Sequence, residues 1–296
     1  MANVIKIKKG LDINLKGKAS DVLLNGGKSD SYAIVPDYYN GIVPKVVAKV
    51  GEKVKAGSVL MIDKNRPEIK FVSPVSGEVT AVNRGEKRKV LSVVVKPEAQ
   101  IEYEDFGKKN VASLKREEVK EAILHAGMWP FIKQRPYDIV ASPADEPRDI
   151  FVSAFYSAPL APNFDFVVKG QEVDFQTGLD ALAKLTDGKV YVGIRKGSSV
   201  SVKGVETVEV EGPHPAANVG VQINHIKPIN KGEVVWTVNP ADVIVIGRLF
   251  NKGIADFSRL VVITGSETTE RGYVKAIAGC TIASLVDGKI MRGNED

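Results

Sequence analysis

Two stretches in the first third of the chain are near-repeats of each other: NGIVPKVVAKVGEKVKAGSVLMIDK (residues 40–64) and SPVSGEVTAVNRGEKRKVLSVVV (residues 73–95). Each has a glycine, alternating apolar residues, a Gly-Glu-Lys turn (residues 51–53 and 85–87) and a further apolar strand. Glycine tolerates the positive φ that such turns need, and alternating apolar residues are typical of short strands. The repeat predicts two similar all-β arms, over residues 34–97, that fold on each other as a small sandwich.

The chain after this repeat alternates between strand and helix patterns. Apolar runs at residues 149–155, 189–194 and 205–210 predict strands. Apolar residues at helical spacing predict helices over residues 113–127 and 177–188. Strand, helix and strand at these distances form a βαβ unit, which predicts a parallel sheet.

Cap residues indicate where the helices begin. Ser113 is the expected N-cap of the first helix, and Thr177 with Asp180 forms a capping-box pattern for the second. A third helix is expected to begin within GPHPAANVGVQI (residues 212–223), with prolines before its first turn.

A fourth helix is predicted for NPADVIVIGRLFNKG (residues 239–253), with Asn239 as N-cap and Asp242 completing the box. Its β-branched run also suits a strand. RLVVITG and YVKAI then predict strands, and the chain stops at GNED (residues 293–296) without a closing element.

The composition excludes several classes of protein. Over 296 residues, 41 Lys+Arg stand against 36 Asp+Glu, a net charge of +5 that is too mild to indicate nucleic-acid binding. Hydrophobic residues at 44% and charged residues at 26% exclude extensive disorder. The single cysteine, Cys280, excludes an internal disulfide, a multi-cysteine zinc site and an iron–sulfur cluster, and fits a reducing compartment. No apolar run reaches the ~18 residues of a membrane span, and no secretory signal is present.

The hairpin between the two arms resembles the lysine hairpin of a lipoyl/biotinyl carrier domain, in which MIDK precedes SPVSGEV. Lys64 would be the residue that is modified. Ser73, however, follows nine residues later, and the hairpin contains Arg66 and Pro67, which do not suit the tight turn that a modifying enzyme reads. The sequence therefore favours an unmodified module that serves as a docking surface.

Phosphate and metal sites find little support. Gly-x-Gly-x-x-Gly is absent, and GIRKGSS (residues 193–199) is a Gly-Ser loop that suits a turn better than an anion nest. The histidines, His125, His214 and His225, are dispersed, which argues against a metal site. His125 ends a helix, where an imidazolium interacts favourably with the helix dipole.

The stretch GMWPFIKQRP (residues 127–136) is the most unusual in the chain. It places apolar side chains beside cations: Met128, Trp129, Phe131, Lys133 and Arg135. Such a set suits a planar ligand with carbonyl oxygens, or a hot spot for a partner protein. The alternative is that Trp129 and Phe131 plug the seam between two domains.

Several motifs in order resemble the family of the A subunit of Na⁺-translocating NADH:quinone reductase. Besides the two arms they are VIKIKKGLDINLKG (4–17), HAGMWPFIKQRPYD (125–138), IFVSAFYSAPLAPN (150–163), VEGPHPAANVGV (210–221) and VIVIGRLFNKG (243–253). The resemblance covers essentially the whole sequence. Chains of that family continue past residue 296, so the resemblance implies a truncated chain.

The resemblance implies an α/β protein of several domains. It begins with an N-terminal segment, residues 1–33, that packs on the later domains. A barrel-sandwich hybrid domain of the lipoyl/biotinyl type follows at residues 34–100. A Rossmann-like parallel-sheet domain is expected at 101–255, and a further small α/β segment, truncated, at 256–296.

The resemblance also implies a function. The chain would be a peripheral subunit, on the cytoplasmic face of the bacterial inner membrane, of a six-subunit translocase that carries electrons from NADH to ubiquinone and exports Na⁺. Its main partner would be the membrane-embedded B subunit, and the isolated chain is not expected to be active. The alternatives are a cofactor-free scaffold of that or an Rnf-like complex, and a lipoyl-type carrier.

No redox cofactor is expected on this chain; FMN, FAD, riboflavin and the 2Fe-2S centre would belong to partner subunits. Two related proteins, the C subunit of the Rnf complex and the flavin-bearing subunit of complex I, carry a glycine-rich loop for FMN and NADH phosphates. Residues 127–136 have lost those glycines, and bulky side chains deny a phosphate its approach to the backbone. Tyr156 and Ser157 replace the acidic signature of the relatives.

A quinone site is the remaining expectation. A quinone headgroup is flat and apolar with two carbonyl acceptors, so its site needs an aromatic or methionine face and one or two donors. Met128, Trp129 and Phe131 are the expected face. Arg135, or His214 brought in from the GPHP turn, is the expected donor.

Overall fold

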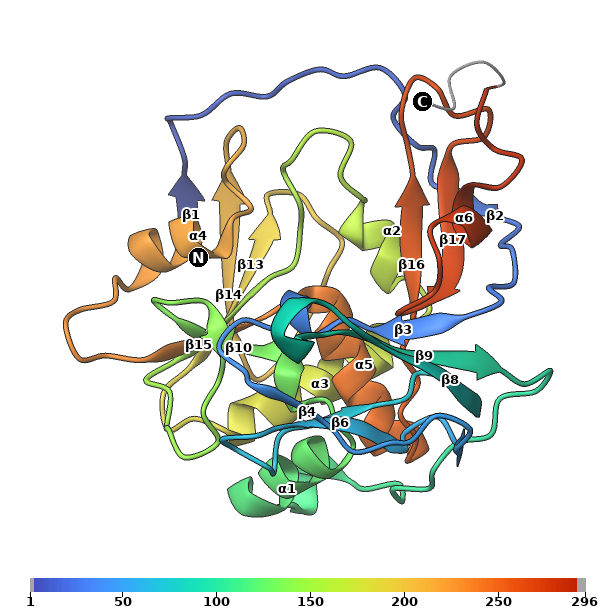
Figure 1. Ribbon diagram of the computed structural model, residues 1–296. Helices are drawn as coiled ribbons and strands as arrows, with labels where there is room; N and C mark the ends of the chain where they lie inside the picture. The colour runs from blue at the N-terminus through green and yellow to red at the C-terminus, as the bar shows by residue number, and fades with distance from the viewer. Residues whose placement is uncertain (1–2, 292–296) are drawn as a thin grey trace.

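The computed structural model describes residues 3–291 (Figure 1). Residues 293–296 (GNED), where the sequence predicts no closing element, lie outside the described residues.

The largest element is a seven-stranded sheet in the order β1-β14-β13-β12-β15-β10-β11. From β1 to β15 neighbouring strands are parallel, and β10 and β11 are added antiparallel at the edge. The strands are β1 Asn3–Lys6, β10 Ile132–Arg135, β11 Ile139–Val140, β12 Ile150–Ser153, β13 Val190–Arg195, β14 Glu206–Glu211 and β15 Val235–Val238.

Helices cover both faces of this sheet, as the predicted βαβ units require. Ile150 and Val152 of β12 pack in one core with α3 and α5, whereas Phe151 between them packs with Ile223 of α4. Successive residues of a strand point to opposite faces, so α4 lies opposite α3 and α5. The helices are α1 Arg116–His125, α2 Phe164–Val168, α3 Glu172–Lys184, α4 Val219–Ile226 and α5 Pro240–Lys252.

The predicted two-arm sandwich is confirmed. A four-stranded sheet, β3-β9-β8-β5, and a three-stranded sheet, β4-β6-β7, enclose a core that includes Leu60, Val79 and Val93. The strands are β3 Tyr32–Ile34, β4 Pro44–Val46, β5 Lys53–Val54, β6 Val59–Asp63, β7 Lys70–Val72, β8 Gly77–Arg84 and β9 Val90–Pro97. Short 3₁₀ turns accompany them: η1 Pro36–Tyr38 and η2 Glu86–Arg88 in this unit, and η3 Val111–Ser113 and η4 Trp129–Phe131 beyond it.

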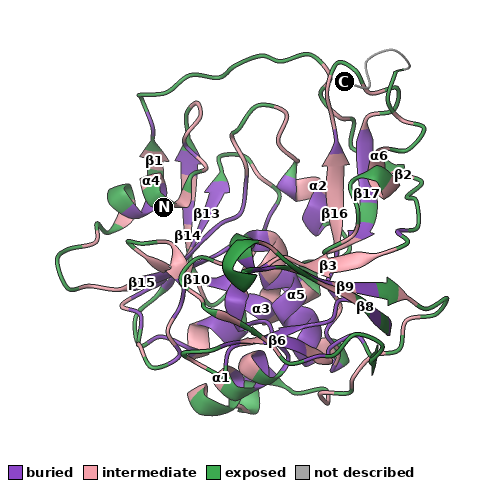
Figure 2. Ribbon diagram, in the orientation of Figure 1, coloured by how far each residue is buried: buried purple, intermediate pink, exposed green. Residues whose placement is uncertain are grey.

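A third sheet joins the two ends of the chain. The predicted strands β16 Ser258–Ile263 and β17 Gly272–Ile277 form a hairpin, followed by α6 Ala283–Val286. β2 Leu23–Leu24 adds to the hairpin, parallel to β17. The N-terminal segment therefore runs from the α/β sheet at β1, across the top of the molecule in Figure 1, to the third sheet at β2. Figure 2 shows that this crossing is exposed, while α5 is largely buried.

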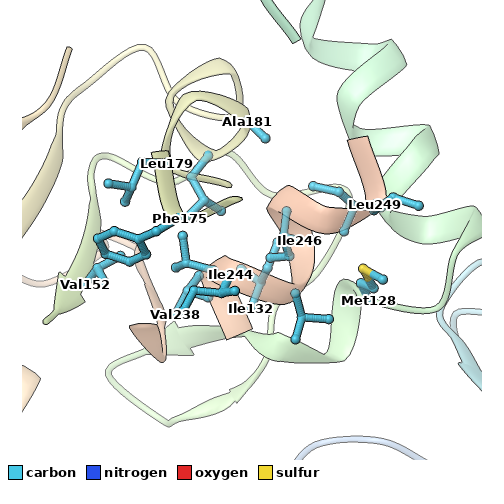
Figure 3. Close-up of a cluster of buried hydrophobic side chains, with 14 of the residues drawn as sticks. Met128, Ile132, Val152, Phe175, Leu179, Ala181, Val238, Ile244, Ile246 and Leu249 are labelled. Carbon is cyan, nitrogen blue, oxygen red and sulfur yellow. The ribbon is translucent and has the colours of Figure 1, made fainter. Parts of the chain in front are cut away.

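One continuous apolar core joins the sandwich to the α/β domain. Phe71 and Val72 of β7 pack in the same cluster as Met128, Trp129 and Ile132. Figure 3 shows the α/β side of this core, where Met128 and Ile132 lie beside side chains of α5. The seam between the two units is thus filled by side chains of the GMWPFIKQRP stretch.

Two helix starts differ from prediction. α1 begins at Arg116 with Lys115 as N-cap, because Ser113 closes the turn η3 instead. α3 begins at Glu172, five residues before Thr177, because burying Phe175 favours an earlier start. The Thr177–Asp180 capping box is therefore wrong, and Thr177 Oγ1 contacts Asn251 Oδ1 at 3.2 Å.

The two later helices are confirmed within the predicted ranges. α4 begins at Val219, after a turn that ends with Asn218 N donating to Pro215 O. α5 forms despite its β-branched run, because both faces of that run are buried, and the Asn239 side chain caps it by accepting from Ala241 N. Asp242, expected to complete a capping box, pairs with Arg259 at 3.0 Å instead. In residues 3–291 no helix has the length and apolar character needed to cross a bilayer.

Candidate functional site

The order of the parallel strands creates a crevice between β12 and β15. After β12 the chain moves outward through β13 and β14, and α4 then brings it back to β15 on the other side of β12. In sheets of this kind ligands bind outside the carboxyl ends of the strands, where the strand order reverses. A cavity of about 640 Å³ occupies this place and is called here the switch-point crevice. Its lining includes Phe131, Lys133, Arg135, Asp138, Ser153, Tyr156, Asn218, Thr237, Asn239 and Asp242.

The side chains of this lining come from several elements, among them β10, the end of β12 and the start of α5. β10 contributes alternate residues, Lys133 and Arg135, because side chains two apart share a face. Tyr156 follows the end of β12, and its hydroxyl lies 3.2 Å from Oδ1 of Asn239, the cap of α5. Asp242 lies in the first turn of α5.

Two carboxylates that line the crevice, Asp242 and Asp138, each form an ion pair with an arginine. The Asp242 carboxylate accepts from Arg259 Nη2 at 3.0 Å, and Arg135 Nε lies 3.4 Å from Asp138 Oδ1. Burial nevertheless raises the pKa of Asp242, against the opposing effects of Arg259 and Lys133. Burial also raises the pKa of Tyr156 to about 12. The crevice is therefore a place where ionisable groups are shielded from water, which is common at functional sites.

A second cavity, of about 340 Å³, lies on the far side of Phe131 and Lys133, under the sandwich. We call it the sandwich cavity. Tyr39 and Phe71 line it from the sandwich, with rings that meet edge to face at 4.8 Å. Phe131, Lys133 and Asp242 line both cavities, so the two are neighbours across these three side chains.

The structure separates the five predicted quinone-site residues into three groups. Phe131 and Arg135 both line the switch-point crevice. Met128 and Trp129 are each 0% exposed, so neither offers a free face in the described chain. His214 lies outside the crevice lining; its Nδ1 is 3.0 Å from Ser157 Oγ, and its backbone N donates to Asp12 Oδ1.

Lys133, Tyr156 and Asp242 line the crevice but were not predicted as site residues. The sequence drew attention to each of them for another reason. Lys133 is a cation beside aromatic residues, Tyr156 departs from the acidic signature of the relatives, and Asp242 was expected to cap a helix. The missing signal was positional, because Tyr156 and Asp242 each follow the end of a strand in the parallel sheet. That position would have suggested a site if the strand order had been known.

The Gly-Ser loop at residues 193–199 holds a carboxylate of its own chain. Ser198 Oγ, Ser199 Oγ and Ser199 N all donate to Asp165 Oδ1, at 2.8, 2.7 and 2.6 Å. These hydrogen bonds lower the pKa of Asp165, although burial opposes them. The donors that a phosphate would need are therefore already used.

The GMWPFIKQRP stretch does not fit a flavin phosphate. Gly127, with φ +67°, ends α1, and a Cβ placed there would lie 2.5 Å from Val72 Cγ1. Met128 and Trp129 fill the adjoining space in the core. A phosphate needs open backbone amides, and this loop faces packed side chains instead.

Comparison with known proteins agrees with the division of the chain into two units. The family model for the NqrA N-terminal barrel-sandwich hybrid domain matches residues 5–98, and the model for the NqrA second alpha/beta domain matches residues 114–255. The chain belongs to the NqrA family. Both the resemblance seen in the sequence and the predicted fold class, a barrel-sandwich hybrid followed by an α/β domain, are thereby confirmed.

Curated NqrA relatives are named as the A subunit of Na(+)-translocating NADH-quinone reductase. The protein of Neisseria meningitidis serogroup A is 35% identical over 293 residues, which cover 97% of this chain and 66% of the relative. That of Hahella chejuensis is 36% identical over 292 residues, covering 97% and 65%. That of Yersinia pestis bv. Antiqua is 34% identical over 296 residues, covering 98% and 66%. The chain thus spans about two thirds of the length of these relatives.

Two solved structures of NAD+-reducing [NiFe]-hydrogenase, in the air-oxidized and the H2-reduced state, also match this NqrA-family chain. Their TM-scores are 0.37 and 0.39 at 11% identity. The matches cover 60% and 62% of this chain, and 39% and 41% of theirs. Scores this low carry no argument about the site.

Proposed function

We propose that this NqrA-family chain is a peripheral subunit of a Na⁺-translocating NADH:quinone reductase, and that its switch-point crevice belongs to the quinone-reducing end of the enzyme. The name of its relatives supports the first part of the proposal. The electrons come from NADH, ubiquinone accepts them, and Na⁺ export is coupled to their transfer. The remaining argument comes from the crevice.

The observation that supports the crevice is its pairing of aromatic faces with cationic donors. Phe131 and Tyr156 line it together with Lys133 and Arg135. A quinone headgroup is flat, and its two carbonyl oxygens accept hydrogen bonds. An aromatic contact contributes about 0.5–1.5 kcal/mol beyond burial, and a hydrogen bond from a charged donor contributes about 1.5–3 kcal/mol.

The proposed surroundings follow the family. The chain docks on the membrane-embedded B subunit, on the cytoplasmic face of the bacterial inner membrane, and FMN, FAD, riboflavin and the 2Fe-2S centre are held by partner subunits. The packed loop at residues 127–136 supports the view that this chain brings no flavin. Its part is to bind the quinone headgroup or to form one wall of the quinone site.

The test uses the assembled enzyme with Phe131→Ala or Arg135→Ala, and Tyr137→Ala as a control because its side chain is 79% exposed outside the crevice lining. NADH oxidation is measured as ubiquinone-1 is varied. We expect KM for ubiquinone-1 to rise about tenfold or more in the two crevice variants, since about 1.4 kcal/mol is a factor of ten. If both variants assemble and keep the wild-type KM, the chain is a scaffold and the quinone site lies elsewhere.

A further inference from the structure

Lys133 occupies the boundary between the two cavities. Its side chain is half-buried and lines both the switch-point crevice and the sandwich cavity. Its ammonium lies 5.2 Å from the centroid of the Tyr39 ring. Within residues 3–291 the Nζ atom makes no hydrogen bond and no ion pair within 4 Å.

The nearby carboxylates are engaged by other cations. Asp242 accepts from Arg259 Nη2 at 3.0 Å, and Asp138 lies 3.4 Å from Arg135 Nε. Both carboxylates favour the charged form of Lys133 from a distance, but burial outweighs them and lowers its pKa. Partial withdrawal of a charged amine from water without a hydrogen-bond partner in the protein carries a cost, although Lys133 Nζ keeps some contact with solvent. The Tyr39 ring offsets part of this cost but supplies no acceptor.

The surroundings of Lys133 define the shape of a ligand. The Phe131 ring lies two residues earlier in the chain, at the end of η4, and the guanidinium of Arg259 is 5.9 Å from the centroid of that ring. Phe131 and Lys133 both line the crevice, so a ligand that reaches Nζ from there also meets the Phe131 side chain. A flat ligand ring with an oxygen acceptor at its edge can contact the Phe131 ring and accept a hydrogen bond from the Lys133 ammonium.

We propose that Lys133 donates a hydrogen bond to a ring carbonyl of the quinone and is the residue that distinguishes a quinone from an aromatic ring of the same size. This inference rests on the proposed function of the crevice and adds the recognition group to it. The ammonium carries three donor protons and no acceptor, so an oxygen acceptor such as a ring carbonyl suits it. Arg135, whose Nε lies 3.4 Å from Asp138 Oδ1, supplies a second cation to the crevice.

The test compares two ligands and three proteins by isothermal titration calorimetry on the full 296-residue chain. The ligands are ubiquinone-1 and its aromatic ring analogue in which a methyl group replaces each of the two carbonyl oxygens. The proteins are the wild type, Lys133→Met and the control Lys169→Met, an exposed lysine outside the crevice lining. Methionine keeps the length of the side chain and removes the donor.

We expect the wild type and Lys169→Met to bind ubiquinone-1 with about tenfold or higher affinity than the methyl analogue, because a charged hydrogen bond is lost with the carbonyl oxygen. Lys133→Met should bind both ligands with nearly equal affinity, close to that of the methyl analogue on the wild type. Lys133→Arg, which restores a donor, should recover part of the preference.

Two results would overturn the inference while leaving the proposed function in place. One is a Lys133→Met chain that keeps the full preference for ubiquinone-1. The other is a variant that weakens both ligands equally, which would mean that Lys133 only supports the wall beside Tyr39. A wild-type chain that binds neither ligand would overturn the inference, because this chain would then not hold a quinone by itself, and it would leave only the role of one wall of a shared site.

Discussion

The indole rings of Trp129 and Trp236 meet edge to face, with centroids 5.4 Å apart and planes at 83°. Trp129 Nε1 also donates to Ala141 O at 2.8 Å, and the Trp129 side chain is 0% exposed. The pair joins η4 to β15 in the core shared by the sandwich and the α/β domain. Trp129 therefore contributes to stability, and the part of the stretch that lines the switch-point crevice begins at Phe131.

Replacing Trp129 with alanine should lower the free energy of unfolding by about 3–5 kcal/mol, because it opens a cavity and removes the edge-to-face contact. Urea unfolding followed by circular dichroism measures the change. Tyr137→Ala, at a side chain that is 79% exposed, should shift the midpoint little and serves as the control. Equal midpoints for the wild type and Trp129→Ala would contradict the central role of the pair.

Asp149 should make stability depend on pH. Its side chain is 1% exposed, and Oδ2 accepts from Arg148 Nε and Lys227 Nζ, each at 2.7 Å. Burial alone would raise the pKa of Asp149, but these bonds and one from Lys189 N outweigh burial and lower it. Because the pKa is lower in the folded state, the contribution is complete above the unfolded value of about 4 and is lost as pH falls through the folded value.

Asp149→Asn should therefore cost about 1.5–3 kcal/mol of stability at pH 7, and the difference from the wild type should shrink below about pH 4. Urea unfolding at a series of pH values measures both. The matched control is Asp187→Asn, since the Asp187 side chain pairs with Arg116 but is 86% exposed. A difference that stays constant from pH 7 to pH 3 would exclude this account.

Lys64 should remain unmodified when the chain is expressed beside lipoyl and biotinyl ligases. Arg66, two residues on, pairs with Asp63 at 2.8 Å and donates to Gly41 O and Val140 O at 2.9 and 3.1 Å. The hairpin is thus tied to the α/β domain, whereas a carrier hairpin has to be free to enter a ligase. Intact mass spectrometry should give the mass of the sequence; an added lipoyl or biotinyl mass on the hairpin peptide would disprove the prediction.

The purified chain should be colourless. The packed side chains at residues 127–136 leave no open backbone for a flavin phosphate. Absorbance at 450 nm, measured after desalting a chain refolded with excess FMN, should be no higher than that of the Gly127→Ala variant treated in the same way. Retention of about one flavin molecule per wild-type chain would refute the prediction.

The sequence predicted those features that depend on neighbouring residues. The Gly-Glu-Lys repeat indicated two β arms, and the capped segment beginning at Asn239 indicated α5. Helix starts were less accurate, because the early start of α3 depends on where Phe175 is buried. The crevice could not be predicted, because it depends on the order β13-β12-β15, which no local pattern encodes. The surroundings of Lys133 could not be predicted either, because they depend on ion pairs between other residues, Asp242 with Arg259 and Asp138 with Arg135.

The placement of the N-terminal segment sets the order in which the fold can be completed during synthesis. β1 lies beside β14, and Leu23 and Leu24 of β2 pair with Tyr273 and Val274. β1 and β2 therefore leave the ribosome well before the strands that pair with them, and until those strands emerge they lack these partners. Contacts this distant in sequence slow folding and favour help from chaperones. The nascent chain has to keep β1 unpaired until β14 has emerged, and β2 unpaired until β17 has followed.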